Sequence, residues 1–211
     1  MKRPLFLYIA IFVQTVIAVW APFFWKRSTF SQRCIIILLV EMSLSSILAL
    51  EMGMHHIRNL WVMHCSTLIE FLIIMTMFYG WKKTKNGKRL LLILGCAFTI
   101  FWCVSKIIFE PFTQMDTYTF AMAQMICIAL AVSVLFDVLK DADTTLKNDS
   151  RVWVASGMVI YSAGTLFVVS LFNVILRSMP QLLNTVWYIN WALAILVVLF
   201  YARSILCRVT H

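Results

Sequence analysis

The sequence has little charge and no stretch long enough for a soluble domain. Asp, Glu, Lys and Arg make up 13% of its 211 residues, whereas hydrophobic residues make up 62%, and the mean hydropathy is +0.89. A chain this apolar cannot hide its side chains in a water-soluble core, so lipid must be its solvent. The connectors between apolar runs are short, and the longest lies near Lys140–Asn148. We therefore predict one transmembrane domain over residues 1–211.

Several chemical signatures are also absent. The sequence has no HExxH motif, no phosphate-binding loop and no CxxC pair, which argues against a zinc protease, a nucleotide-binding protein and a thiol–metal centre. A retinal protein needs a lysine on its last helix, and residues 184–206 contain none. The six cysteines lie within apolar runs or at their ends, where packing is their expected role. We predict neither a metal nor a cofactor.

Seven apolar runs of about twenty residues fill most of the chain, and each is long enough to cross a bilayer. Only helices and closed barrels satisfy their backbone hydrogen bonds in lipid, and these runs are continuous where barrel strands would alternate. The sequence thus predicts an all-α membrane protein, a seven-transmembrane helix bundle. The predicted spans are Leu5–Trp25, Ile35–Met54, Leu60–Gly80, Leu90–Phe109, Tyr118–Leu139, Trp153–Leu176 and Gln181–Leu206.

Basic residues in the connectors predict the orientation. Thirteen Lys and Arg flank the spans on the side of the first connector, and four flank them on the other. The positive-inside rule then places the N-terminus outside and the C-terminus in the cytoplasm, although Lys2 and Arg3 alone favour the reverse. This rule accounts for most of the net charge of +9, so no nucleic-acid partner is expected. The basic run Lys82–Arg89 is suited to anionic lipid head groups.

Glu70 is the most informative polar residue within a span, because it lies near the middle of the third one. An ionised acid there costs about 2.5–3.5 kcal/mol. It must therefore be neutral, or be paired with a cation such as Lys106 or a bound ion. Glu70 could anchor a ligand or act as a proton-linked switch. It could equally be a neutral carboxylic acid that hydrogen-bonds a neighbouring helix.

Other polar residues recur at helical spacing and extend the list of candidate site residues. Glu41 and Ser45 are one turn apart on the second span, and Lys106 lies close enough to the outer boundary to extend its ammonium group toward water. Gly157 and Gly164 share one face of the sixth span, which is typical of close helix packing. The candidate ligand-binding residues are Glu70, Lys106, Asn190, Tyr161, Glu41, Gln124 and His64, and no catalytic residue is predicted.

Three segments carry a resemblance to a known family. They are Asn59-Leu-Trp61 leading into Glu70-Phe71, Trp153 with Gly157, Tyr161 and Gly164, and Trp187-Tyr-Ile-Asn190. With these segments the chain resembles a family of small uncharacterised seven-helix membrane proteins, commonest in the Bacteroidota. The resemblance covers essentially the whole chain in length and in the order of the spans. Its members are often encoded beside sensor kinases or response regulators, which implies the bacterial inner membrane and a sensory or accessory role. The chain departs from the family at Ala192–Leu193–Ala194, where an Asn is usual.

We therefore expect a non-enzymatic, receptor-like or signalling-accessory protein. A small or lipidic ligand would contact Glu70, Lys106 and Asn190 in the outer half, and the basic cytoplasmic loops would contact a signalling protein. A small-metabolite transporter with a proton-linked Glu70 is the alternative. It is favoured by a short similarity between residues 59–64 and 184–190, which fits two three-helix repeats. An intramembrane lipid hydrolase is a further alternative, and it requires Glu41 and Glu70 to be adjacent.

Overall fold

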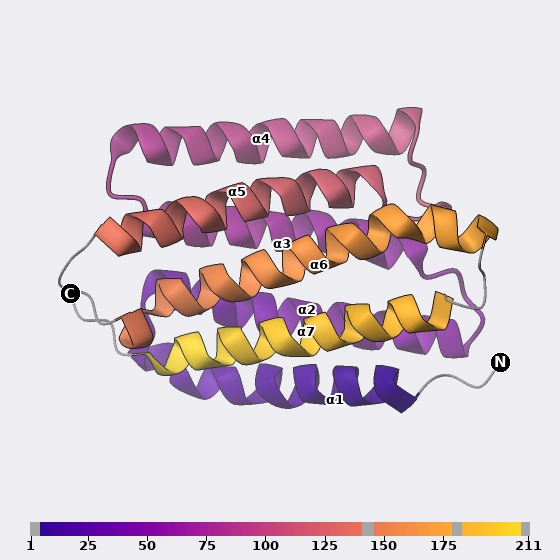
Figure 1. Ribbon diagram of the computed structural model, residues 1–211, viewed down its shortest axis with the longest axis horizontal. Helices are drawn as coiled ribbons and strands as arrows, with labels where there is room; N and C mark the ends of the chain where they lie inside the picture. Colours follow the sequence, from indigo (N-terminus) through magenta and orange to yellow (C-terminus); the bar gives the residue numbers. More distant parts are fainter. Residues whose placement is uncertain (1–4, 141–145, 179–182, 208–211) are drawn as a thin grey trace. The chain divides into compact units, whose positions relative to one another are not determined.

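The computed structural model describes residues 5–140, 146–178 and 183–207, and in residues 170–184 it describes the helices without their side chains. In this part of the chain, seven helices are long and apolar enough to cross a membrane. They are α1 (Leu5–Trp20), α2 (Phe30–Met54), α3 (Leu60–Trp81), α4 (Lys85–Ile108), α5 (Tyr118–Lys140), α6 (Ser150–Ser178) and α7 (Leu183–Leu206), with short 3₁₀ helices at Ala21–Arg27 (η1) and Leu146–Asn148 (η2) (Figure 1). The predicted all-helical, seven-span fold class is confirmed, whereas the orientation of the termini stays a prediction.

Two helices begin five residues before the predicted spans, because each starts with polar residues. At α2, the side chain of Thr29 accepts a hydrogen bond from the Gln32 backbone N–H, and the Gln32 side chain accepts one from the Thr29 N–H. This reciprocal capping satisfies two backbone donors that the start of a helix leaves free. At α4, the Thr84 hydroxyl accepts from the Gly87 N–H. The basic residues from Lys85 onward therefore belong to the first turns of α4 and not to a connector.

The helix α1 ends earlier than predicted, at Trp20, and the chain continues as the 3₁₀ helix η1. Pro22 explains the change, because proline has no N–H to donate to the carbonyl four residues before it. The apolar segment from Leu5 to Arg27 nevertheless remains long enough to span a membrane.

The helices divide into two compact units. The first contains α1, α5 from Gln124 onward, α6 and α7, and the second runs from Ala21 to Ala123. In the first unit α7 packs against both α1 and α6 (Figure 1). A Cβ atom added to Gly157 would lie 2.6 Å from the Phe200 Cβ, and one added to Gly164 would clash with Leu193. The close helix packing predicted for the two glycines is confirmed, with α7 as the neighbour.

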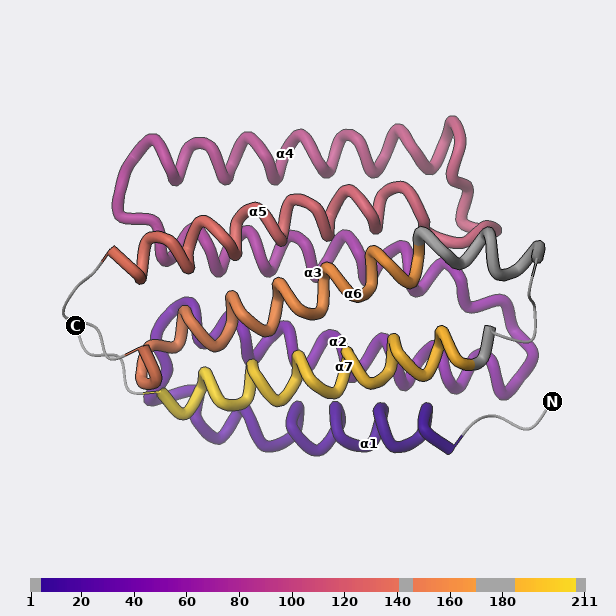
Figure 2. The backbone as a smooth tube through the Cα atoms, in the orientation of Figure 1, coloured from indigo at the N-terminus to yellow at the C-terminus, as the bar shows by residue number. Residues whose placement is uncertain are grey.

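In the second unit α3 packs against both α2 and α4. Three hydrogen bonds tie α2 to α3 along their antiparallel length. The Ser31 hydroxyl donates to the Met77 carbonyl, the Ser66 hydroxyl to Glu41, and the Asn59 side chain to the Ala49 carbonyl. The α2–α3 and α4–α5 connections lie at the same end of this unit, which the charge pattern predicts to be outside (Figure 2). All candidate polar contacts described below lie within this second unit.

Candidate functional site

The structure distributes the candidate residues between the two units. Glu41, His64, Glu70 and Lys106 belong to the second unit, where they form two separate groups. Gln124 on α5, Tyr161 on α6 and Asn190 on α7 belong to the first unit. Their participation in one site with Glu70 stays a prediction.

Glu41 and Glu70 form the first group, which we call the carboxyl pair. Each is near the middle of its helix, and both contact the hydroxyl of Ser66 on α3. The Ser66 Oγ lies 2.8 Å from Glu41 Oε1 and 3.1 Å from Glu70 Oε1. The two carboxyls are therefore neighbours, as the lipid-hydrolase alternative requires, although no periodicity in the sequence could establish it.

The hydrogen count at Ser66 restricts the protonation of this pair. A serine hydroxyl has one hydrogen, so it can donate to only one of the two carboxyls at a time. The second contact is a hydrogen bond only when that carboxyl carries a proton and donates it to Ser66 Oγ. Two ionised carboxylates so close in an apolar medium would also repel each other strongly. The geometry therefore fits a pair that holds one proton.

A groove of about 410 Å³ lies between α2 and α3 and reaches Glu41 of the carboxyl pair. Its walls are mostly apolar, with Leu44 and Leu48 from α2 and Ile69 from α3, and its polar lining includes Glu41 and Ser66. The Glu41 Oε2 atom is buried and has no hydrogen-bond partner. A buried polar atom without a partner costs about 1–3 kcal/mol. The groove thus combines an apolar channel with one unsatisfied oxygen, which is the arrangement expected of a pocket for an amphipathic ligand.

The second group, which we call the ion-pair cluster, lies at the predicted outer end of the second unit. It consists of His64, Lys106, Glu110, Asp116 and Thr119. The Lys106 Nζ lies 2.9 Å from Glu110 Oε2, 2.9 Å from Thr119 Oγ1 and 3.3 Å from Asp116 Oδ1. The side chains of His64, Lys106, Glu110 and Asp116 are all at most 4% exposed. The ammonium group of Lys106 therefore lies in a buried ion pair. This differs from the prediction that it extends toward water.

Glu110 is the best-satisfied member of the cluster. Its Oε1 accepts hydrogen bonds from the backbone N–H groups of Thr117 and Tyr118, both at 2.6 Å. Burial alone would raise the pKa of this carboxyl, but the hydrogen bonds from Lys106, Thr119 and the two backbone groups outweigh it and lower the pKa to about 2. Glu110 is accordingly ionised, and it holds the α4–α5 connection against the end of α4.

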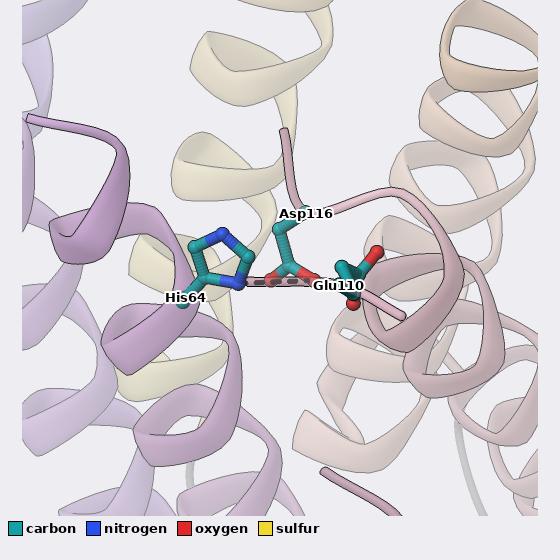
Figure 3. A group of neighbouring side chains, drawn as sticks. All are labelled: His64, Glu110 and Asp116. Carbon is teal, nitrogen blue, oxygen red and sulfur yellow. Dashed lines mark ion pairs between the residues drawn. The ribbon is translucent and has the colours of Figure 1, made fainter. Parts of the chain in front are cut away.

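His64 approaches the cluster from α3, with its ring directed toward Asp116 (Figure 3). Its Nδ1 lies 3.7 Å from Asp116 Oδ1, and its Nε2 lies 3.0 Å from the Gln114 carbonyl oxygen. The backbone carbonyl of His64 accepts a hydrogen bond from the Trp102 indole at 3.1 Å. His64 Nδ1 and Asp116 Oδ2 are both buried and have no hydrogen-bond partner.

His64, Glu110 and Asp116 place one donor atom each within 4.8 Å of one another, a spacing that could hold a metal ion. The Lys106 ammonium group already occupies the space between the two carboxyls. A metal ion would have to displace this group from three hydrogen-bond acceptors. We therefore interpret the cluster as an ion-pair network that fastens α3, α4 and the α4–α5 connection together.

The cluster also tests whether Lys106 is the partner of Glu70, which was one of the predicted alternatives. A lysine ammonium has three hydrogens, and those of Lys106 are all engaged by Glu110, Asp116 and Thr119. Lys106 is thus not the partner of Glu70, and that alternative is wrong.

Asp116 and Thr119 are the members of the cluster that the sequence analysis missed. Asp116 belongs to a connector, where an acidic residue is ordinarily solvated, and Thr119 begins an apolar span. The one available signal was Lys106 itself, since a lysine inside a span requires an anion nearby.

Comparison of the chain with protein-family models, with curated proteins and with solved structures finds no match.

Proposed function

We propose that the protein is a receptor-like or signalling-accessory membrane protein that binds a lipidic ligand in the groove between α2 and α3. The ligand has an apolar body and one hydrogen-bond donor, a hydroxyl or an amine, which binds Glu41. Two observations carry this proposal: Glu41 lines the groove, and its buried Oε2 atom has no hydrogen-bond partner.

A polar group in this position requires a reason, because apolar side chains alone would pack α2 against α3 at lower cost. An intramembrane carboxyl is a functional candidate by default. A ligand hydroxyl or amine would satisfy Oε2, and the apolar walls of the groove would hold the ligand's chain. The residues of the ion-pair cluster do not line this groove, whereas Glu41 and Ser66 do, so Glu41 is the carboxyl within reach of a ligand there.

Ligand binding at Glu41 has a direct route to a structural change. A donor bound at Glu41 Oε2 stabilises Glu41 as the ionised member of the pair, which leaves the shared proton on Glu70 and directs it toward Ser66. A change in the hydrogen bond that joins α2 to α3 favours a different packing of these helices. The basic connectors on the predicted cytoplasmic side would transmit this change to a signalling partner.

The test uses a photoactivatable long-chain alcohol, diazirine-labelled hexadecanol, with the protein in lipid nanodiscs. Labelling is expected at residues of the α2–α3 groove, and excess hexadecanol should suppress it whereas hexadecane, which lacks a donor, should not. A hydrogen bond to a charged group contributes about 1.5–3 kcal/mol. Glu41→Leu should therefore lower the competed labelling at least about tenfold.

Glu51→Leu is the matched control, because Glu51 lies on the same helix and its side chain is 56% exposed. It should leave the groove labelling unchanged. Glu70→Gln should leave the groove intact. It should weaken the ligand-dependent change in the packing of α2 against α3, because the pair can no longer exchange its proton. Equal competed labelling in wild type and Glu41→Leu would remove the basis of the proposal.

A proton-coupled transporter is the second candidate, and the geometry of the carboxyl pair, which fits a single shared proton, favours it. The two candidates differ in what they predict for proteoliposomes. A transporter would accumulate solute, or move protons, when a pH gradient is imposed, and Glu70→Gln would abolish this flux. A receptor would show no gradient-dependent flux while still binding the alcohol probe.

A further inference from the structure

A second groove, of about 690 Å³, lies on the other side of α3, between α3 and α4. Its walls include Leu72, Met75 and Tyr79 from α3 and Leu92, Gly95 and Ile100 from α4. The α4 residues that line it extend from Leu91 to Ile100, which is about 14 Å along the helix axis. The volume is within the range of about 300–1,000 Å³ that ligand pockets occupy.

Gly95 keeps this groove open. A Cβ atom added at Gly95 would meet no other atom within 4 Å, so the space is not filled by neighbouring side chains. One turn further along α4, Phe98 fills the interface instead, and its ring centroid lies 3.9 Å from that of Phe71. The gap is thus a local feature of the helix pair, located next to the residue that has no side chain.

The end of the groove at Tyr79 adjoins the basic segment Lys82–Arg89. The Lys88 Nζ lies 4.9 Å from the centroid of the Tyr79 ring, which lines the groove. Lys83, Lys85 and Arg89 are exposed. An apolar channel therefore opens beside a basic segment in which three cationic side chains are exposed.

We propose that this surface binds one anionic glycerophospholipid, with an acyl chain in the α3–α4 groove and the phosphate group at the basic segment. The site is independent of the α2–α3 ligand groove. Within a bilayer an acyl chain gains no hydrophobic free energy by entering a groove, so the chain contributes packing and the charge contributes selectivity. The first turns of α4 add to the attraction, since a helix N-terminus favours a nearby anion.

The test measures lipid retention by native mass spectrometry of the detergent-solubilised protein, with 1-palmitoyl-2-oleoyl phosphatidylglycerol as the probe and the phosphatidylcholine of the same chains as the comparison. One molecule of the anionic lipid should bind in preference to the zwitterionic one. Each basic residue near a membrane surface contributes about 1 kcal/mol, about fivefold in affinity. Lys85→Gln with Arg89→Gln should therefore weaken binding about 25-fold.

The double substitution Lys26→Gln with Arg27→Gln is the matched control, because it removes the same charge from η1, which does not line the groove. It should leave lipid binding unchanged. Gly95→Leu places its Cβ atom in open space and extends a side chain into the groove, and it should lower binding at least tenfold, with the helical content and thermal stability retained.

Two results would overturn the proposal. Equal retention of the anionic and zwitterionic lipids would show that the basic segment does not select the head group. Undiminished binding in Gly95→Leu would show a head-group contact without a chain in the groove.

Discussion

Replacement of Lys106 by Met tests whether the ion-pair cluster stabilises the fold. The substitution keeps most of the apolar side chain but removes the ammonium group from between Glu110 and Asp116. Two buried carboxyls then face each other without a cation. Removal of one partner from a buried ion pair typically costs 3–5 kcal/mol, because the other charge stays buried and uncompensated. We expect a loss in this range for Lys106→Met.

The expected loss of stability comes from the uncompensated charge and not from lost packing. A triple variant can separate these two contributions. Lys106→Met combined with Glu110→Gln and Asp116→Asn removes the repulsion together with the attraction. The cost of a broken buried ion pair comes mainly from the charge that stays buried without a partner, and the triple variant leaves no such charge among these three residues. The triple variant should therefore recover most of the stability that the single variant loses.

The measurement is reversible unfolding in mixed detergent micelles by titration with sodium dodecyl sulphate, followed by far-ultraviolet circular dichroism. Lys83→Met is the control, because Lys83 is exposed and its replacement should change the unfolding free energy by less than about 1 kcal/mol. The reasoning is refuted if Lys106→Met unfolds at the same detergent fraction as Lys83→Met. It is also refuted if the triple variant is less stable than the single one.

Two further predictions concern acid stability and helix packing. The pKa of Glu110 in the folded protein, about 2, lies below its ordinary value of 4.5, so its contribution is present above pH 4.5 and disappears as the pH falls toward 2. This difference corresponds to about 3 kcal/mol, which acid unfolding of the wild type should show and Glu110→Gln should lack. In the α6–α7 contact, Gly157→Ala meets the Cβ of Phe200, whereas Gly164→Ala meets the flexible end of Leu193. Gly157→Ala should therefore lower the thermal unfolding temperature more than Gly164→Ala does.

The seven helices could be predicted because the bilayer sets both their length and their composition. The ends were less predictable, because α2 and α4 begin with polar residues that resemble a connector. The reciprocal capping of Thr29 and Gln32 was present in the sequence as a T-x-x-Q pattern, and it gives the beginning of α2 correctly. Apolarity thus identifies the core of each span, and capping chemistry identifies where the helix begins.

The site was less predictable than the fold, since helix periodicity places residues on one helix but not on its neighbours. It placed Glu41 and Ser45 on one face, and both line the α2–α3 groove. It could not establish that Glu41 faces Ser66, nor that Lys106 binds an aspartate ten residues further along the chain. Those contacts depend on how α2, α3 and α4 are rotated against one another, which the packing of their apolar side chains determines.

The two polar groups of the second unit differ in how completely their hydrogen-bonding capacity is used. All three Lys106 hydrogens and both Glu110 oxygens are bonded, whereas His64 Nδ1 and Asp116 Oδ2 are buried without a hydrogen-bond partner. Glu41 also has an unpartnered oxygen, it shares one serine hydrogen with Glu70, and it lines an apolar groove. The ion pairs of Lys106 favour one arrangement of the cluster, whereas the carboxyl pair can alternate between arrangements of similar energy. For this reason a search for the ligand should begin at Glu41 and not at the more highly charged cluster.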